Sequence, residues 1–535
     1  MNRLAPYLLL AALCVSLFLV GLGATPLVGL DESMYAESAR EMVASGDYVI
    51  PTFNSDPFFD KPPLVYWMQA ASIRLFGVNS FAVRLPSTVA ALALVALTVF
   101  LGSKLFNRQT GLLAGMILAC SILTTALARM AILDMAFTLA ITAALGAFIL
   151  TYIGIWRSWG YVAFWGAMGV SVMIKGPAGA VLIAAVVGVF VALGKWRAES
   201  GEWRAKGRES RWIAHILGII LFALIVAPWY IAVQSETGGT FLREFIFHQN
   251  IQRALGKDFD HNQPFYTYVP IYLLTFFPWA AFVPVAWKRL VRLRPTSNVE
   301  MAALFVAVWM AVVFLVFSCI KSKLFGYIYP MYPASAMLVA ALWARVIESE
   351  ESAILRKSAW AAAGLSVLVG GALIAAPFVM GSKLPPGLTP PLAIMGAGLV
   401  LGSLVGLAMA RRARPVAAFA AFTAGACVFL LAAIHIGLPT ASKTMSDPIV
   451  ALGKRIQSVA GPTERVFAYN LRPTPRGIPF YAQRPVPDIK TKADLRKALS
   501  QGPCLVIAQK GHADSTLARL KNVSLSGQYV FYRSE

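Results

Sequence analysis

The feature that most constrains this chain is a series of apolar runs, each about as long as a membrane-crossing helix. A helix needs roughly 20 predominantly apolar residues to cross the hydrocarbon core of a bilayer, and such runs recur from one end of the sequence to the other. Of the 535 residues, 58% are hydrophobic and only 13% are charged, which excludes an ordinary water-soluble domain. The chain is therefore predicted to be a polytopic α-helical membrane protein.

About thirteen spans are predicted from these runs. They cover residues 5–23, 81–101, 110–127, 130–150, 159–174, 177–194, 211–233, 267–288, 300–319, 325–346, 358–381, 389–410 and 415–437. The first run is interpreted as an uncleaved anchor rather than a signal peptide, because Asp31 follows it closely and would otherwise lose its tether.

Basic residues predict the orientation of these spans. Lys and Arg gather in alternate short connections, for example 195–211, 288–294 and 411–414, which the positive-inside rule assigns to the cytoplasm. The loop 24–80 then faces the outside, and an odd number of spans places the tail after Leu438 on the same side. The formal charge of +22 is explained by this pattern and by contact with anionic lipids, so nucleic acid is not an expected partner.

The composition changes after Leu438. Short strand and helix patterns in this tail predict a small α/β domain. They cover 465–469, 492–499, 504–508, 515–520 and 529–532. We therefore divide the chain into a membrane domain, 1–438, with 24–80 as its first outer loop, and an outer α/β domain, 439–535.

The stretch Leu30–Trp67 is the polar exception near the N-terminus, and we interpret it as the active centre. It carries the adjacent acids Asp31 and Glu32, and it also contains the pair Asp60 and Lys61. These are residue types that can handle a proton or hold an anionic group.

Two short helices are predicted in this outer loop. Ser33 is expected to cap the first and Gly46 to end it, with Glu37, Arg40 and Glu41 on the polar face opposite the apolar one. The second is expected to run over 64–76. Amphipathic helices of this kind lie on the membrane surface, where they would fold Asp60 and Lys61 towards Asp31.

Asp134 is an acid within an apolar run. A charged group there costs about 2.5 to 3.5 kcal/mol on insertion scales, so it should face a cavity or a partner. Arg129 is one possible partner, and a cavity shared with Asp31 is the functional alternative.

Cations recur at the outer ends of the predicted spans. They are Lys61, Lys175, Arg253, Lys321 and Lys323. Snorkelling to lipid headgroups explains any one of them, whereas several converging near carboxylates favour an anionic substrate such as a phosphate.

A divalent metal such as Zn²⁺ is a candidate cofactor. Asp60 and His248 could supply an oxygen and a nitrogen ligand, although a lone histidine such as His248 or His261 is more often structural. The sequence has no Walker motif and no GxGxxG, so no nucleotide cofactor is expected.

An ordered set of motifs covers nearly all of the predicted membrane part. It comprises DESMYAESAREM, GDYVIPTFN, FFDKPPLVYW, FAVRLPS, ARMAILDM, KGP, APWY, FHQNIQR, PW and SKLFGYIYP. This set resembles the GT-C glycosyltransferases that use polyprenyl-phosphate sugars, in the branch of bacterial aminoarabinose transferases related to protein O-mannosyltransferases. The resemblance implies about thirteen helices, juxtamembrane helices in the first periplasmic loop and a periplasmic C-terminal domain.

The resemblance also implies roles for single residues. Asp31 matches the essential acid and Asp134 a second cavity acid; Lys61 and Arg253 match groups that bind the lipid phosphate. Asp60 and His248 match a metal pair, although the first position is usually Glu in the aminoarabinose branch. Tyr35 and Tyr327 match cavity tyrosines, and with Glu32 and Lys323 they complete the predicted substrate-binding set.

The implied function is inverting transfer of a sugar, with 4-amino-4-deoxy-L-arabinose as a candidate, from undecaprenyl phosphate to lipid A or another envelope glycan. The implied setting is the periplasmic face of a bacterial inner membrane, with membrane lipids around a monomer. Two alternatives stay open. One is a protein O-mannosyltransferase-like or other glycan-modifying enzyme. The other is a lipid-linked sugar flippase, which would place its charges near mid-membrane between repeated halves.

Overall fold

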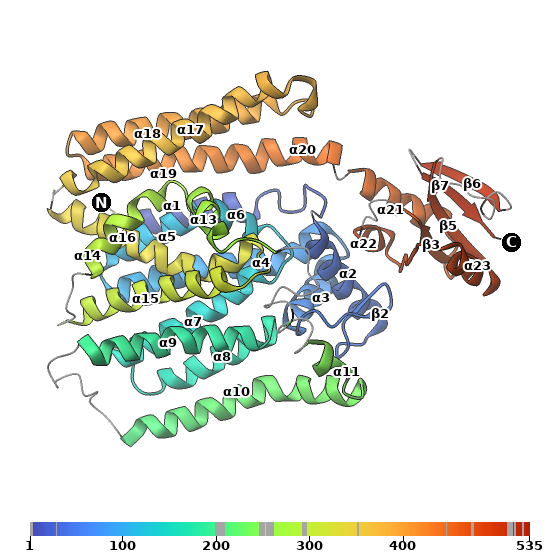
Figure 1. Cartoon of the computed structure of the whole chain (residues 1–535), viewed down its shortest axis with the longest axis horizontal. Coiled ribbons are helices and arrows are strands. Elements are labelled where there is room, and N and C mark those ends of the chain that lie inside the picture. The colour runs from blue at the N-terminus through green and yellow to red at the C-terminus, as the bar shows by residue number, and fades with distance from the viewer. Residues whose placement is uncertain are drawn as a thin grey trace.

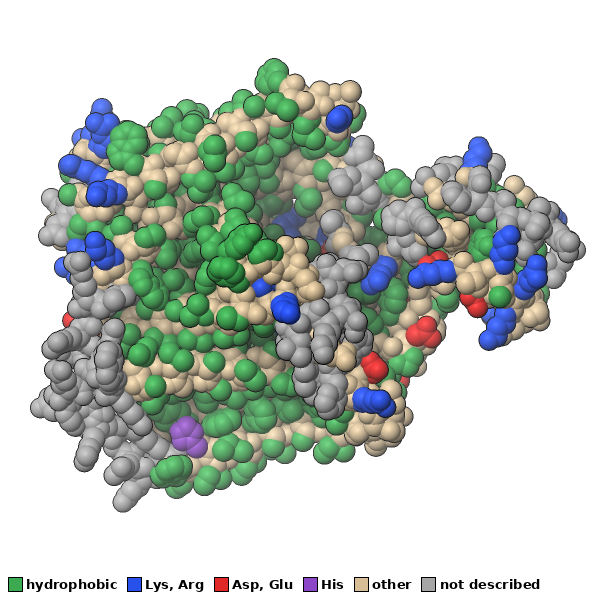
Figure 2. All heavy atoms as spheres, viewed as in Figure 1, with side chains coloured by type: hydrophobic (Ala, Val, Ile, Leu, Met, Phe, Trp, Pro, Cys, Tyr) green, Lys and Arg blue, Asp and Glu red, His purple; other side chains and the backbone are tan. Residues whose placement is uncertain are grey.

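The computed structural model describes residues 4–27, 29–197, 209–245, 252, 262–291, 297–349, 352–445, 447–471, 476–510, 517, 520–526 and 529–534. Helices run side by side in one large body, and a smaller part with a β-sheet sits at one end of it (Figure 1). Hydrophobic side chains cover the visible face of the helical body, while most charged ones gather at its ends and on the smaller part (Figure 2).

Among the described residues, eight helices are long and apolar enough to cross a membrane. The number of candidate spans rises to ten if each of two bent helix pairs counts as one span. The eight contain α4 (Ser80–Leu105), α7 (Asp134–Tyr152), α10 (Glu209–Glu236), α15 (Asn298–Cys319), α16 (Tyr332–Ser349), α17 (Arg356–Met380), α18 (Thr389–Arg411) and α19 (Pro415–Ala432). The prediction of a multi-span membrane protein is confirmed.

The bent pairs and three shorter apolar helices account for the remaining predicted spans. The first pair is α5 (Arg108–Ala119) with α6 (Ile122–Ala128), bent by 68°, and the second contains α13 (Tyr268–Thr275) and α14 (Val283–Val291), bent by 110°. The shorter elements are α1 (Ala5–Cys14) with η1 (Val15–Leu19), α8 (Gly160–Lys175) and α9 (Pro177–Arg197). Thirteen crossings stay a prediction, because length and composition alone assign eight to ten.

Small residues allow the helices α17, α18 and α19 to pack closely. A Cβ added to Gly370 would lie 2.6 Å from the carbonyl oxygen of Gly396, and one added to Gly402 would lie 2.5 Å from the Cα of Gly425. Such contacts between backbones are typical of helix packing in membranes, where small residues replace the hydrophobic drive for association.

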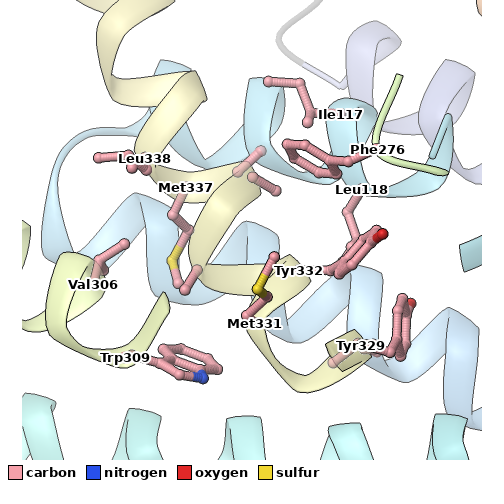
Figure 3. Close-up of a cluster of buried hydrophobic side chains, with 14 of the residues drawn as sticks. Ile117, Leu118, Phe276, Val306, Trp309, Tyr329, Met331, Tyr332, Met337 and Leu338 are labelled. Carbon is pink, nitrogen blue, oxygen red and sulfur yellow. The ribbon is translucent and has the colours of Figure 1, made fainter. Parts of the chain in front are cut away.

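Buried aromatic, aliphatic and methionine side chains pack together inside the helical body (Figure 3). Trp309 on α15 donates its indole N–H to the carbonyl oxygen of Pro330 at 2.9 Å. Pro330 belongs to the 3₁₀ turn η6 (Phe325–Met331), whose Tyr329 and Met331 are buried in this cluster. The core therefore fixes the turn that carries Tyr327.

The predicted helices of the first loop are α2 (Leu30–Ser45) and α3 (Leu64–Phe76). Gly46 and Gly77 end them as predicted. The start of α2 differs from the prediction, because Gly29 is the N-cap, with φ 83°, a conformation that favours glycine. Ser33 lies inside the helix and donates its hydroxyl to the Gly29 carbonyl at 3.1 Å.

The polar face of α2 is buried, which corrects the prediction of a solvated face on the membrane surface. Arg40 donates two hydrogen bonds of 2.7 Å to the Glu37 carboxylate and a third, of 3.3 Å, to the carbonyl of Gln483 in the C-terminal part. Glu41 accepts hydrogen bonds from the Thr52 hydroxyl and the Ser55 backbone N–H. The face is covered by residues too distant in sequence for a helical pattern to reveal.

The buried Glu37 carboxylate makes stability sensitive to pH. Burial raises its pKa from 4.5 to about 7, although Arg40 opposes the shift. Because the folded-state pKa is the higher one, the stabilising contribution is full below about pH 4.5 and is lost as the pH rises through 7. We expect the Tm of the wild type to fall relative to that of Glu37→Gln between pH 5 and 8 in thermal unfolding scans. A Tm difference that is the same at both pH values would contradict the assignment.

The C-terminal part contains a five-stranded sheet with the order β4-β3-β5-β7-β6. Its strands are β3 (Arg465–Tyr469), β4 (Asp488–Ile489), β5 (Cys504–Gln509), β6 (Lys521–Ser526) and β7 (Tyr529–Arg533). β3 pairs in parallel with β4 and β5, whereas β7 pairs antiparallel with β5 and β6. The helices of this part are α21 (Asp447–Val459), α22 (Ile478–Ala482) and α23 (Lys492–Ser500), whereas α20 (Leu438–Met445) continues the line of α19 in the helical body (Figure 1).

Hydrogen bonds hold this sheet-containing part on the first loop, which lies beside it in Figure 1. The Tyr481 hydroxyl accepts a bond of 2.7 Å from the Leu27 backbone N–H. The Asn54 side chain accepts one of 2.9 Å from the Val486 N–H, next to the small hairpin β1 (Thr52–Phe53) and β2 (Asp56–Pro57). The loop predicted to be the active centre is thus held against the C-terminal part of the chain.

Candidate active site

Asp31 is the exposed acid of the candidate site. It lies in the first turn of α2, where the free N–H groups of a helix favour a negative charge. Burial and the charge of Asp60 raise the pKa of Tyr35 and Tyr66, and the charge of Asp31 contributes to both shifts.

Lys61, Asp60 and Tyr35 form a connected group next to Asp31. The Lys61 ammonium donates to Asp60 Oδ1 and to the Asp60 carbonyl oxygen, both at 2.8 Å. Tyr35 donates its hydroxyl to Asp60 Oδ2 at 3.0 Å. Burial, followed by the charge of Asp60, raises the pKa of Tyr35, so the phenol keeps its proton and remains a donor. The structure brings these predicted residues together.

A second group joins Asp134, Lys175 and Tyr327. The Lys175 ammonium donates to Asp134 Oδ1 at 2.8 Å and lies 4.6 Å from the centre of the Tyr327 ring. A Cβ added to Gly326 would lie 3.0 Å from Asp134 Cγ, so glycine lets the turn before Tyr327 approach the carboxylate. Lys175 is therefore the partner of Asp134, and the suggestion that Arg129 pairs with it is wrong.

Arg129 instead closes the end of the first apolar helix. Its guanidinium donates to the carbonyl oxygens of Leu17, Phe18, Val20 and Gly21, with the two shortest distances at 2.9 and 2.8 Å to Val20 and Gly21. The last carbonyl groups of a helix have no partner within it, so a buried arginine that binds several of them stabilises the helix end.

Glu32 has a different environment from the one predicted. Its carboxylate is 1% exposed and accepts hydrogen bonds from Arg84 Nε at 2.8 Å and Nη2 at 3.1 Å, and from the Ala131 N–H at 2.9 Å. Arg84 also donates to the carbonyl oxygens of Leu22, Thr25 and Pro26. These contacts join the loop to α4 and the α6–α7 break, and they give no support to a phosphate-binding role for Glu32.

The sequence analysis did not identify Arg84 as the partner of Glu32. The available signal was a charged residue inside an apolar run, because such a residue needs a partner as much as Asp134 does. Its several carbonyl acceptors could not be read from the sequence.

Lys323 follows α15 and is 6% exposed. Its ammonium donates to the carbonyl oxygens of Ser318, at 3.0 Å, and Ile320, and lies 5.8 Å from the centre of the Tyr268 ring. Desolvation lowers the pKa of this ammonium. In this arrangement Lys323 closes the end of α15, and its predicted contact with a substrate phosphate stays a prediction.

Arg253, His248 and His261 lie outside the described residues. Within the described part of the chain, no group of three or more His, Cys, Asp or Glu side chains could hold a metal ion. Both Asp60 oxygens accept hydrogen bonds, Oδ1 from the Lys61 ammonium and Oδ2 from the Tyr35 hydroxyl. The metal pair of Asp60 and His248 stays a prediction.

Comparisons with known proteins show similarity to glycosyltransferases that use lipid-linked sugars. The family model of dolichyl-phosphate-mannose-protein mannosyltransferases matches residues 60–231. Undecaprenyl phosphate-alpha-4-amino-4-deoxy-L-arabinose arabinosyl transferases are also similar. The enzyme of Aeromonas salmonicida is 31% identical to this chain, and the alignment covers 64% of this chain and 61% of that enzyme. The enzyme of Pectobacterium carotovorum is also 31% identical, and the alignment covers 72% of this chain and 66% of that enzyme. The chain is a homologue of these transferases.

The resemblance to aminoarabinose transferases drawn from the motifs is therefore confirmed. The aligned part spans about three fifths of the length of the first of these relatives. A crystal structure of ArnT from Cupriavidus metallidurans bound to undecaprenyl phosphate superposes with a TM-score of 0.80 at 22% identity, covering 100% of this chain and 99% of that one. The archaeal oligosaccharyltransferase AglB from Archaeoglobus fulgidus is more distant, with a TM-score of 0.57 at 12% identity over 95% and 69% of the two chains. The aminoarabinose transferase fold thus extends over the whole chain.

Proposed function

We propose that this protein is an inverting glycosyltransferase that moves a sugar from undecaprenyl phosphate to lipid A or a related envelope acceptor. The first candidate for the sugar is 4-amino-4-deoxy-L-arabinose, the group named in the similar transferases. The proposed setting is the periplasmic face of a bacterial inner membrane, with the C-terminal α/β domain on that side and the protein as a monomer.

The observation that carries the proposal is that the Asp31 carboxylate and the Lys61 ammonium lie in one connected group of side chains. Asp31 lies one helical turn before Tyr35, whose hydroxyl reaches Asp60, which in turn holds the Lys61 ammonium. An acid for the acceptor and a cation for the leaving phosphate therefore lie in one loop, as transfer from a lipid phosphate requires.

The reaction breaks the bond between the anomeric carbon and the phosphate oxygen. The electron pair of that bond passes to the phosphate, and Lys61 stabilises the charge that gathers there. The acceptor oxygen forms the new bond from the opposite face, which inverts the anomeric centre. If the acceptor is a hydroxyl, its proton passes to Asp31; if it is a phosphate monoester, whose second pKa is about 6, Asp31 serves to position it.

The metal pair predicted at Asp60 and His248 is left out of this mechanism. The Asp60 carboxylate orients Lys61 and accepts from Tyr35, and both parts follow from the described contacts. No step in the proposed reaction requires a nucleotide, because the lipid phosphate is already the leaving group.

Transfer by the purified protein is the direct test. Radiolabelled undecaprenyl phosphate-aminoarabinose and lipid A bisphosphate would be incubated with the protein in detergent, and labelled lipid A would be measured. We expect label in lipid A with the wild type and none without protein. Movement of the labelled donor between the leaflets of proteoliposomes, with no covalent transfer to any acceptor, would favour the flippase instead.

A protein acceptor remains the second candidate, because the matching family model is that of protein mannosyltransferases. The same incubation with periplasmic protein in place of lipid A separates the two. Label in protein and none in lipid A would replace the proposed acceptor while keeping the chemistry.

The Lys61 ammonium should affect use of the donor. Lys61→Gln removes the positive charge next to Asp60, so we expect kcat/KM for the undecaprenyl phosphate sugar to fall by at least about 100-fold, the usual size for a lost electrostatic contact to the transition state. Steady-state kinetics with varied donor measure this. Lys383→Gln, at an exposed lysine in the turn 381–383 that follows α17, is the matched control and should change kcat/KM little.

A further inference from the structure

A cavity of about 460 Å³ lies between the first loop and the C-terminal domain. Its walls come from both parts of the chain. The loop supplies Met34, Phe53, Asn54 and Phe58, and the C-terminal domain supplies Ala468, Arg476, Ile478, Pro479, Val486, Asp488 and Lys490. The Phe58 ring lies 6.4 Å from the Tyr35 ring, so the cavity adjoins the candidate active site.

The segment that carries Arg476 packs against the first turns of α2. Arg476 Nη1 lies 2.8 Å from Met34 Sδ, and a Cβ added to Gly477 would lie 3.2 Å from Ser33 Oγ. Met34 is three residues after Asp31, and residues at this spacing are neighbours on a helix surface. The guanidinium of the C-terminal domain therefore lies about one helical turn from the exposed acid.

The charges of the cavity favour an anion. Arg476 and Lys490 are exposed cations on its domain side, and Asp488 is the one acid among the lining residues. Arginine presents a planar set of donors that matches a phosphate, and lysine adds a compact charge. The thioether of Met34 is a weak acceptor, so the cost of exchanging it for a phosphate oxygen is small.

The cavity is also distinct from the place of the leaving phosphate. Lys61 lies in the group with Asp60 and Tyr35, whereas Arg476 and Lys490 approach from the C-terminal domain. Two separate cationic groups near one acid suit a reaction with two anionic partners, one of which departs and one of which arrives.

We propose that Arg476 and Lys490 bind a phosphate group of the acceptor next to Asp31, which makes the C-terminal domain part of the acceptor site. The inference rests on the proposed function, because it names the residues that recognise the acceptor in that reaction. The ligand class is a phosphorylated glycan headgroup, and lipid A bisphosphate is the probe.

The experiment compares Arg476→Gln and Lys490→Gln with the wild type, with donor and acceptor varied separately. Each substitution removes a charge-assisted hydrogen bond, so we expect the KM for lipid A bisphosphate to rise about tenfold. The KM for the undecaprenyl phosphate sugar should stay within twofold. Arg476→Lys keeps the charge without the planar donors and should recover only part of the affinity. Lys497→Gln, at an exposed lysine on α23 away from the cavity, should behave as the wild type.

Binding of lipid A bisphosphate in the absence of donor gives a second measurement that does not depend on turnover. The Kd should rise about tenfold in both Gln variants and not in Lys497→Gln. An unchanged acceptor KM and Kd, or a fall in kcat alone, overturns the subsite. Absence of transfer by the wild type refutes the proposed function, and in that case the binding measurement alone decides the subsite.

Discussion

Asp31→Asn is expected to reduce sugar transfer by at least about 100-fold while leaving the fold intact. General base catalysis and the positioning of an acceptor contribute roughly 10² to 10⁴ in rate, and Asn has the shape of Asp without its charge or basicity. Asp31 is exposed at the start of α2, so the same-sized Asn should leave the packing of the helix in place. Single-turnover transfer to lipid A at saturating donor measures the loss.

The Tm of the purified variant serves as its control for folding. Glu236→Gln, at an exposed acid that ends α10, provides a matched substitution away from the loop and should keep full activity. Activity of Asp31→Asn within threefold of the wild type would remove Asp31 from the mechanism.

Arg84→Gln should give the largest loss of stability. It leaves the Glu32 carboxylate buried without its cation and removes donors from three backbone carbonyls. Breaking a buried ion pair by removing one partner costs about 3 to 5 kcal/mol, because the remaining charge stays in a medium of low polarity. Thermal unfolding in detergent measures this loss as a fall in Tm. The unfolding is detected by the reactivity of the buried cysteines as they become accessible.

The double variant Glu32→Gln/Arg84→Gln separates the ion pair from packing. It should be more stable than Arg84→Gln alone, because no buried charge is then left without its cation. Arg496→Gln, at an exposed arginine on α23, should leave Tm unchanged. A Tm for Arg84→Gln equal to that of Arg496→Gln would show that Arg84 does not hold the loop.

Local patterns in the sequence predicted local structure well. The helix from Leu64 to Phe76 and its stop at Gly77 follow from residues within that segment, and so does the end of α2 at Gly46. The apolar runs predicted the helices of the membrane body because each run must bury itself in lipid or protein whatever its neighbours are.

Long-range pairing could not be predicted in the same way. Lys175 is 41 residues after Asp134 and Arg84 is 52 after Glu32, so no helical or strand period relates the partners. The buried face of α2 is a further example, since Arg40 is covered by Gln483 from the C-terminal domain. Sequence reasoning identified that Asp134 needs a partner or a cavity, but it offered Arg129 as the partner and did not consider Lys175.

The contacts between the C-terminal part and the first loop have a consequence for biosynthesis. Leu27, Arg40 and Asn54 are bonded to residues that follow them by 454, 443 and 432 positions. Translation proceeds at about 5 to 20 residues per second, so these partners emerge from the ribosome roughly 20 to 90 s after the loop. The nascent chain therefore inserts its membrane helices with an unfinished first loop, and the contacts that hold the candidate site are completed only when the last hundred residues have been made.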